Sequence, residues 1–139
     1  LARLGRADRK GAPDTFDPAG YVALLARIRA GRDIVHAPVF RREIEEPVAG
    51  AIAVRPGHRL VVTEGNYLLH WPEVRPLLDA CWYVDIDEGT RIDRLVARHV
   101  AHGRAPEAAR AWVLRSDEAN ARLVQAGRHR ADRILRWPG

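Results

Sequence analysis

The chain has 139 residues, of which 47% are hydrophobic and 29% are charged, a composition typical of one folded domain with a real core. We therefore treat residues 1–139 as a single domain. No apolar run approaches the roughly 20 residues needed to cross a bilayer, and no signal-peptide pattern opens the chain, so we expect no membrane association. The only cysteine, Cys81, cannot form an internal disulfide, which favours a cytoplasmic location.

The net charge is +5, from 23 lysines and arginines against 18 acidic residues, and Lys10 is the only lysine. Arginine presents a planar fork of donors that matches phosphate. Because aromatic residues are few and there is no lysine-rich tail, a phosphorylated ligand is favoured over a nucleic acid. A basic nucleic-acid-binding domain stays the least favoured hypothesis, and we expect no nucleic-acid partner.

The sequence contains no methionine and begins at Leu1. Because translation starts with methionine, we expect the chain to be part of a longer protein.

Residues 1–16 are typical of a basic loop, and the first helix follows it. Asp17 supplies a side-chain cap and Pro18 suits the first helical position, so together they predict where this helix starts. Gly31 is a natural stop, because glycine readily adopts the left-handed conformation at a helix end.

Short strands and helices are predicted in alternation along the rest of the chain. Pro38 is expected to end the first strand. Strands that alternate with helices favour an α/β fold with a parallel sheet. The predicted strands are 34–37, 49–54, 60–62, 80–84 and 131–135, and the later predicted helices are 71–78, 89–102 and 107–125.

The stretch that organises these elements begins with Leu60, Val61 and Val62. This short apolar run predicts a strand buried on both faces of a parallel sheet. Glu64 and Gly65 follow at once. In open α/β sheets the ligand lies outside the carboxyl ends of the strands, so Glu64 is well placed to hold magnesium with phosphate oxygens. The alternative is a strand that simply ends at a polar residue.

The predicted helix 89–102 carries Arg91, Arg94 and Arg98 at i, i+3 and i+7, which places three guanidinium groups on one face. Arg104 follows the helix. A polyanionic ligand would relieve the repulsion between these like charges, and phosphoryl transfer needs such groups to stabilise the transferred phosphoryl. The alternative is the solvated face of an amphipathic helix.

Two further sets of polar residues are weaker candidates. Asp85 and Asp87 follow the strand predicted at 80–84, and helix capping is favoured over metal binding for both. A second set lies in loops that flank the first helix and strand, where it could line a substrate pocket or only carry solvated charge. This set is Arg9, Lys10, Asp14, Phe40, Arg41 and Arg42.

Several of these segments together resemble the phosphoribulokinase/uridine kinase family of P-loop kinases, in particular its bacterial nucleoside/nucleotide kinase-like branch. Ala131-Asp132 near the end is also similar to the start of the family's last strand. The match keeps its order over nearly the whole chain. The segments that carry it are Arg9–Asp17, Ala37–Phe40 with Glu46–Ile52, Leu60–Leu69 with its Glu-Gly, and Trp82–Asp85 through Thr90-Arg91, Arg94, Arg98 and Gly103-Arg104.

The resemblance implies a parallel-sheet, Rossmann-like three-layer α/β fold. It also implies ATP-dependent phosphoryl transfer, with Mg²⁺, to a small-molecule acceptor that is a nucleoside, a sugar or a pantothenate-like compound. In that reading Glu64 helps to place the metal, and a lid region at about 91–106 closes over the phosphates. The implied roles are Glu64, Arg94 and Arg98 in catalysis, Arg91 and Arg104 in binding the nucleotide, and Lys10, Phe40 and Arg41 in binding the acceptor.

The departures from the family pattern concern the phosphate loop and the sheet. The motif Gly-x-x-x-x-Gly-Lys-Ser/Thr does not occur in the 139 residues, and the family's catalytic aspartate and N-terminal strands are also expected upstream of Leu1. The family places a strand between the positions of 60–64 and 81–85. We therefore expect this span alone to be inactive and its apolar sheet edges to favour a homodimer.

Two further departures concern the acceptor. Uridine kinases carry a ribose-binding aspartate where this chain has Arg9–Gly11, and they commonly have aspartate where it has Arg41. These changes make a phosphorylated or acidic acceptor conceivable. The alternative to an enzyme is a relative without a phosphate loop that binds a ligand or a partner.

Overall fold

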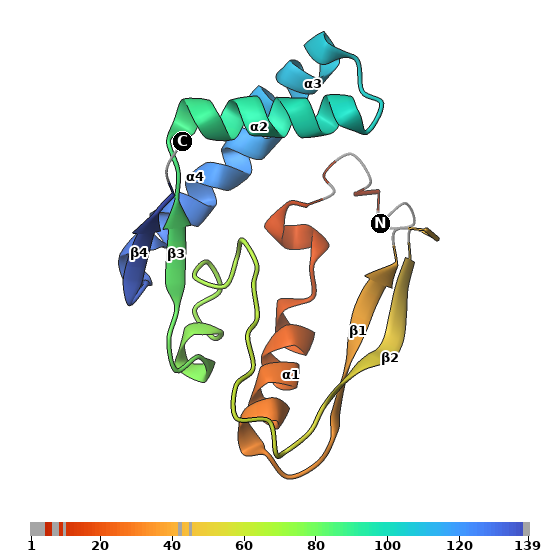
Figure 1. Ribbon diagram of the computed structural model, residues 1–139, viewed down its shortest axis with the longest axis vertical. Coiled ribbons are helices and arrows are strands. Elements are labelled where there is room, and N and C mark those ends of the chain that lie inside the picture. The colour runs from red at the N-terminus through yellow and green to blue at the C-terminus, as the bar shows by residue number, and fades with distance from the viewer. Residues whose placement is uncertain (1–4, 7–8, 10, 42, 45, 138–139) are drawn as a thin grey trace.

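The computed structural model describes residues 5–6, 9, 11–41, 43–44 and 46–137. They form two separate two-stranded sheets that are joined by helices and loops (Figure 1). Strands β1 (Val35–Arg41) and β2 (Glu46–Val54) pair antiparallel as a hairpin, whereas β3 (Trp82–Asp85) and β4 (Arg133–Arg136) pair in parallel. Lys10 and Arg42, two of the residues proposed for the acceptor side, lie outside the described residues.

Helix α1 (Pro18–Ala30) begins and ends where the sequence predicts. The Asp17 carboxylate accepts a hydrogen bond of 2.8 Å from the Gly20 amide, which satisfies a backbone donor that has no partner within the helix. Gly31 ends the helix with a φ of 59°, in the left-handed region that favours glycine.

We predicted that Pro38 ends the first strand, and this prediction was wrong. Strand β1 continues to Arg41, and the pairing with β2 shifts register between Ala37 and Val39. Proline cannot donate to the ladder, and a bulge accommodates that loss. The hairpin also means that the strand predicted at 49–54 pairs antiparallel and lies outside the parallel sheet.

The parallel pair β3–β4 confirms the predicted strands on either side of a long helical crossover. Asp132 fixes where the pair begins, because its carboxylate accepts from the Cys81 amide at 2.6 Å and from Arg75 at 2.6 Å. The short helix predicted at 71–78 reduces to a 3₁₀ turn, η4 (Arg75–Leu77). The crossover consists of α2 (Glu88–Ala101), α3 (Pro106–Trp112), a π-helical turn η5 (Val113–Asp117), α4 (Glu118–Ala126) and the 3₁₀ turn η6 (Arg128–Arg130).

The stretch 60–64 is not the buried strand that the sequence predicts. It runs between α1 and β3 without joining either sheet (Figure 1), and Leu60 and Val62 are 79% and 80% exposed. A strand buried on both faces needs neighbours that complete its sheet. The resemblance places such a neighbour between this stretch and β3, and none of the described residues occupies that position.

Val74 and Val113 are fully buried, and Val35 and Tyr67 are nearly so. Gly127, after α4, lies so close to Leu69 that a Cβ atom there would be 2.8 Å from the Leu69 carbonyl oxygen. This contact holds the loop after Glu64 against the end of the crossover. No helix in the described part of the chain is both long and apolar enough to cross a membrane.

We predict that Gly127→Ala destabilises the protein. The φ of Gly127 is −84°, which alanine adopts readily, so the effect is steric. Forcing a methyl group against backbone atoms costs about 1–3 kcal/mol, measured as the free energy of unfolding in urea. Gly57→Ala is the matched control, because a Cβ at Gly57 meets no atom within 4 Å. Equal stability of the two variants would contradict the prediction.

Candidate active site

Glu64 is positioned by side chains on both sides of it in the sequence, because its segment has no strand partner. The hydroxyls of Tyr21 on α1 and Thr63 share a hydrogen bond of 2.5 Å. Thr63 is half-buried, whereas Glu64 is exposed. Glu64 has no ion-pair partner among the described residues, so its carboxylate is available to a ligand.

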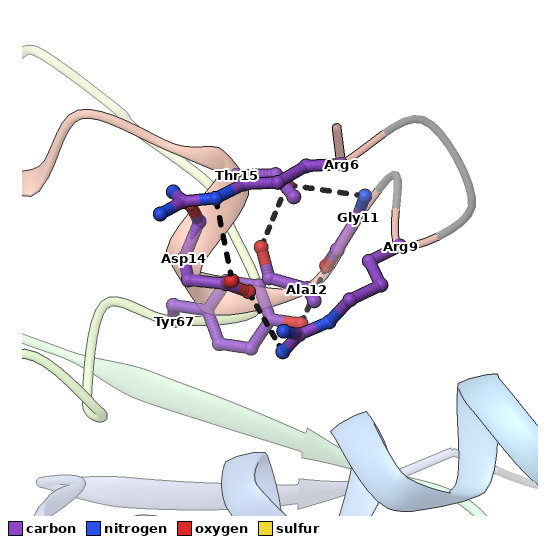
Figure 2. Close-up of polar contacts among 7 residues, drawn as sticks. All are labelled: Arg6, Arg9, Gly11, Ala12, Asp14, Thr15 and Tyr67. Atoms are coloured by element: carbon purple, nitrogen blue, oxygen red, sulfur yellow. Dashed lines mark hydrogen bonds and ion pairs between the residues drawn. The ribbon is translucent and has the colours of Figure 1, made fainter. Parts of the chain in front are cut away.

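Tyr67 anchors the same segment to the loop before α1. Its side chain is buried, and its hydroxyl donates a hydrogen bond of 2.6 Å to the Gly11 carbonyl oxygen (Figure 2). The rings of Phe16 and Trp71 each lie 5.6 Å from the Tyr67 ring, a spacing typical of stabilising aromatic pairs. Burial raises the pKa of Tyr67, and the nearby negative charges add to the rise, so the phenol stays a neutral donor.

The acidic residues that end β3 are engaged in other contacts. Asp87 caps α2 by accepting from the Thr90 amide at 2.9 Å, which confirms helix capping, and that hydrogen bond lowers the pKa of Asp87. Asp85 does not cap the helix but forms an ion pair of 2.8 Å with Arg128. Of the three carboxylates considered for a metal, Glu64 is therefore the one without such a contact.

Glu64 and three of the helix and lid arginines line one large cavity. The cavity has a volume of about 1690 Å³, and its lining includes Glu64, Arg91, Arg98 and Arg104. Arg94 does not line it and instead borders a second, shallower pocket of about 260 Å³, which it shares with Arg91 and Arg98. Within the described residues, Glu64 thus lines the same cavity as Arg91 and Arg98 of α2.

The three guanidinium groups on α2 differ in their surroundings. Arg91 forms an ion pair of 2.5 Å with Glu118, and both side chains are mostly buried. The hydrogen bond from Arg91 to the Glu118 carboxylate raises the pKa of Arg91. Arg94 and Arg98 are exposed. The expected ladder of like charges is therefore partly neutralised, and the exposed pair is best placed to meet an anion.

Arg104 lies just beyond α2, in the predicted lid. Gly103 turns the chain there with a φ of 90°, which glycine adopts at little cost. The Arg104 guanidinium lies 4.4 Å from the centroid of the Trp112 ring, within the range of a cation–π contact. The contact with Trp112 thus holds Arg104 where it lines the cavity.

The residues proposed for the acceptor are not gathered at this cavity. Phe40 and Arg41 lie at the end of β1, are exposed, and do not line it. Lys10 lies outside the described residues. The roles of all three stay predictions.

Known kinases are similar to the chain in sequence. The ATP-dependent kinase-like protein notR′ of Aspergillus versicolor is 37% identical over 123 residues, which are 81% of this chain and 72% of that protein. Pantothenate kinase of Rhodopseudomonas palustris is 28% identical over 73% of this chain and 35% of its own length. Uridine kinase-like protein 5 of Arabidopsis thaliana is 29% identical over 66% of this chain and 20% of its own length. No protein-family model matches the chain.

Solved structures are similar over almost the whole chain. A candidate fructose transport system kinase from Silicibacter sp. TM1040 has a TM-score of 0.82 at 34% identity, covering 99% of this chain and 68% of its own. The chain belongs to the phosphoribulokinase/uridine kinase family of P-loop kinases. YFH7 of Saccharomyces cerevisiae, a candidate P-loop kinase with a circular permutation, has a TM-score of 0.81 at 20% identity over 98% of this chain and 51% of its own, a likeness of fold alone.

The chain has the α/β fold of these kinases but spans only part of the length of its relatives. It spans 72% of the Aspergillus protein but 53% of the Escherichia coli protein YggC, to which it is 31% identical. The activity, acceptor and partners of the whole protein are therefore proposals.

The exposed carboxylate of Glu64 has the chemistry of a magnesium ligand. Magnesium keeps several waters and takes one or two carboxylates together with substrate phosphate oxygens. No group of three or more His, Cys, Asp or Glu side chains that could hold a metal occurs among the described residues. An exposed carboxylate that lines the same cavity as Arg98 and Arg104 suits a metal that arrives with a nucleotide.

Sequence reasoning missed a histidine–aspartate pair that also lines the cavity of this kinase-family chain. His99 Nε2 on α2 lies 3.0 Å from Asp117 Oδ2, and about a quarter of each side chain is exposed. Asp117 is the last residue of the π-helical turn η5, and such turns are frequent at functional sites. The sequence predicted one uninterrupted helix there, and an α-helical pattern carries no signal for a π turn.

We predict that Tyr67→Phe lowers the free energy of unfolding by about 0.5–1.5 kcal/mol at neutral pH, because it removes the hydrogen bond to Gly11. The pKa of Tyr67 is raised in the folded protein, so its contribution is fully present below the ordinary value of 10.0 and is lost as the pH rises through the folded value. Urea denaturation of both proteins between pH 7 and pH 11.5 measures this. A stability difference that stays constant over the whole range would contradict it.

We predict that Glu118→Gln costs about 1–3 kcal/mol of stability, because it leaves the mostly buried Arg91 guanidinium without its counter-charge. Asp79→Asn breaks a matched but exposed pair, since the side chains of Arg29 and Asp79 are 49% and 88% exposed. That control should cost under about 1 kcal/mol. Chemical denaturation of both variants measures the difference, and an equal cost for the two pairs would count against this account of Arg91.

Proposed function

We propose that the protein transfers the terminal phosphoryl group of ATP to a small-molecule acceptor. The observation that carries this proposal is the shared cavity, in which an exposed carboxylate at Glu64 faces the same space as Arg98 and Arg104. A site for a nucleotide needs positive groups for the phosphates and an oxygen ligand for the metal. The kinase names of the relatives support the same reaction class.

Glu64 would hold Mg²⁺ together with water and the phosphates. Bound there, the metal neutralises charge on the phosphate oxygens. Arg98 and Arg94 are exposed on α2, and their guanidinium groups would stabilise the charge that spreads over the transferred phosphoryl. Arg91 is held by Glu118 and would add positive charge next to Arg94 and Arg98.

The segment around Gly103 and Arg104 would serve as the lid. Its closure would exclude water, so that the phosphoryl group reaches the acceptor rather than a water molecule. Lys10, Phe40 and Arg41 would face the acceptor. Relatives are named for pantothenate, for uridine and for fructose transport, so the family alone does not narrow the acceptor beyond a small molecule.

We predict that Arg98→Ala in the whole gene product that contains this chain lowers kcat about 100- to 1000-fold, because a preorganised positive group in the transition state is lost. Arg110→Ala is the control, since Arg110 is exposed on α3 and does not line the cavity. Release of ADP in the presence of Mg²⁺ and a panel of acceptors measures turnover. Normal turnover in the Arg98 variant would remove this residue from the site.

A titration of the same gene product with ATP and Mg²⁺ tests the reaction class itself. Saturable binding is expected if the protein is a kinase. Absence of binding would overturn the proposal in favour of a relative that binds another ligand or a partner without catalysis.

A further inference from the structure

The loop before α1 places two arginines on one carboxylate. Arg9 Nη2 lies 3.1 Å from Asp14 Oδ1, and Arg6 Nε lies 3.9 Å from Asp14 Oδ2. Figure 2 shows Asp14 between the two guanidinium groups. The Arg6 and Arg9 side chains are 45% and 59% exposed. Arg6 Nη1 also donates to the Asp14 carbonyl oxygen at 2.5 Å. Two positive charges on one negative charge leave the cluster net positive, and both arginine side chains stay partly exposed to solvent.

The fold of this loop does not depend on that cluster alone. The Gly11 amide donates to Thr15 Oγ1 at 3.3 Å, and the Thr15 hydroxyl donates to the Ala12 carbonyl at 2.7 Å. Tyr67 clamps Gly11 from the Glu64 segment at 2.6 Å, and Ala12 is buried. Exposed ion pairs contribute only about 0–1 kcal/mol, so the ion pairs on the Asp14 carboxylate add little to the stability of the loop.

The cluster borders the cavity of the candidate active site. Gly11 and Tyr67 both line that cavity. After burial itself, the carboxylates of Asp117 and Asp14 are the groups that raise the pKa of Tyr67, so both lie near its hydroxyl. Asp117 belongs to the crossover that carries Arg98, and Asp14 belongs to the loop before α1. Through Gly11, which Tyr67 holds, the loop that carries the arginine pair adjoins the cavity.

We propose that Arg6 and Arg9 bind an anionic group, a phosphate or a carboxylate, on the molecule that accepts the phosphoryl group. This anion replaces the Asp14 carboxylate as the partner of the two guanidinium groups. This inference rests on the proposed kinase function and names the class of its acceptor. Asp14 holds the two planar forks in place in the free protein, as a carboxylate of the ligand would. A guanidinium only donates hydrogen bonds, so a neutral polyol would gain less from this pair than an oxyanion.

The test titrates inorganic phosphate and, separately, acetate into the whole gene product and follows the arginine Nε–H signals by NMR at constant ionic strength. The Arg6→Gln and Arg9→Gln variants assign the two signals. We expect both signals to shift with phosphate or acetate, and Arg9→Gln to weaken that site at least 5-fold. Shifts confined to other arginines would overturn the proposal. Because no turnover is measured, an inactive kinase would not affect this result.

Asp14→Asn separates an anion site from a structural ion pair. If Asp14 gives way to the ligand, the asparagine variant binds the anion at least 3-fold more tightly, the opposite of Arg9→Gln. If the pair only supports the loop, breaking it from either side changes binding in the same direction or not at all, which would overturn the proposal. Arg27→Gln on α1, exposed like Arg9, is the charge-matched control and should leave binding unchanged.

In the active enzyme, pairs of acceptors that differ only in one anionic group show whether the bound anion is a phosphate or a carboxylate of the acceptor. A hexose, its 6-phosphate and its carboxylate derivative make one such series, and a nucleoside with its 5′-monophosphate makes another. Arg9→Gln should raise KM for the preferred anionic acceptor at least 10-fold and leave KM for ATP unchanged. Preference for the neutral member of every pair that the enzyme accepts would overturn the proposal.

Discussion

The buried phenol of Tyr67 is the contact on which the candidate active site depends. The stretch that carries Glu64 belongs to neither sheet, so no backbone ladder fixes it. Tyr67 holds it to the loop before α1 through Gly11, and Tyr21 holds it to α1 through Thr63. These side-chain contacts give the exposed Glu64 carboxylate a defined place. The same phenol holds Gly11, which lines the cavity, and so keeps the loop before α1 next to it.

Several charged side chains at this cavity are already paired with other groups of the protein. The carboxylates of Asp85 and Asp87 are engaged by Arg128 and by the start of α2, and Glu118 neutralises Arg91. Of the residues proposed for the site, Glu64, Arg98 and Arg104 line the cavity without an ion-pair partner among the described residues. Neutralising the buried members of the cluster keeps its self-repulsion low while the exposed members stay available.

The π-helical turn η5 and the residue after it connect α2 to the rest of the crossover. Its last residue, Asp117, contacts His99, and the next residue, Glu118, contacts Arg91. Two contacts at separate turns of α2 resist rotation of that helix against α4. If the segment after α2 closes as the proposed lid, this pair of contacts would give it a fixed base.

The sequence by itself determined the elements whose signals are local: the caps of α1 at Asp17 and Gly31, the cap of α2 at Asp87, and the strands β3 and β4. It also identified the kinase family, because several short segments keep their order along the chain. Tertiary structure decided the rest. The apolar run at 60–62 has the pattern of a buried strand, but strand formation needs partners, and none of the described residues provides them. The pairing of His99 with Asp117 joins residues 18 positions apart, and such contacts depend on how helices pack, for which a single sequence carries no local signal.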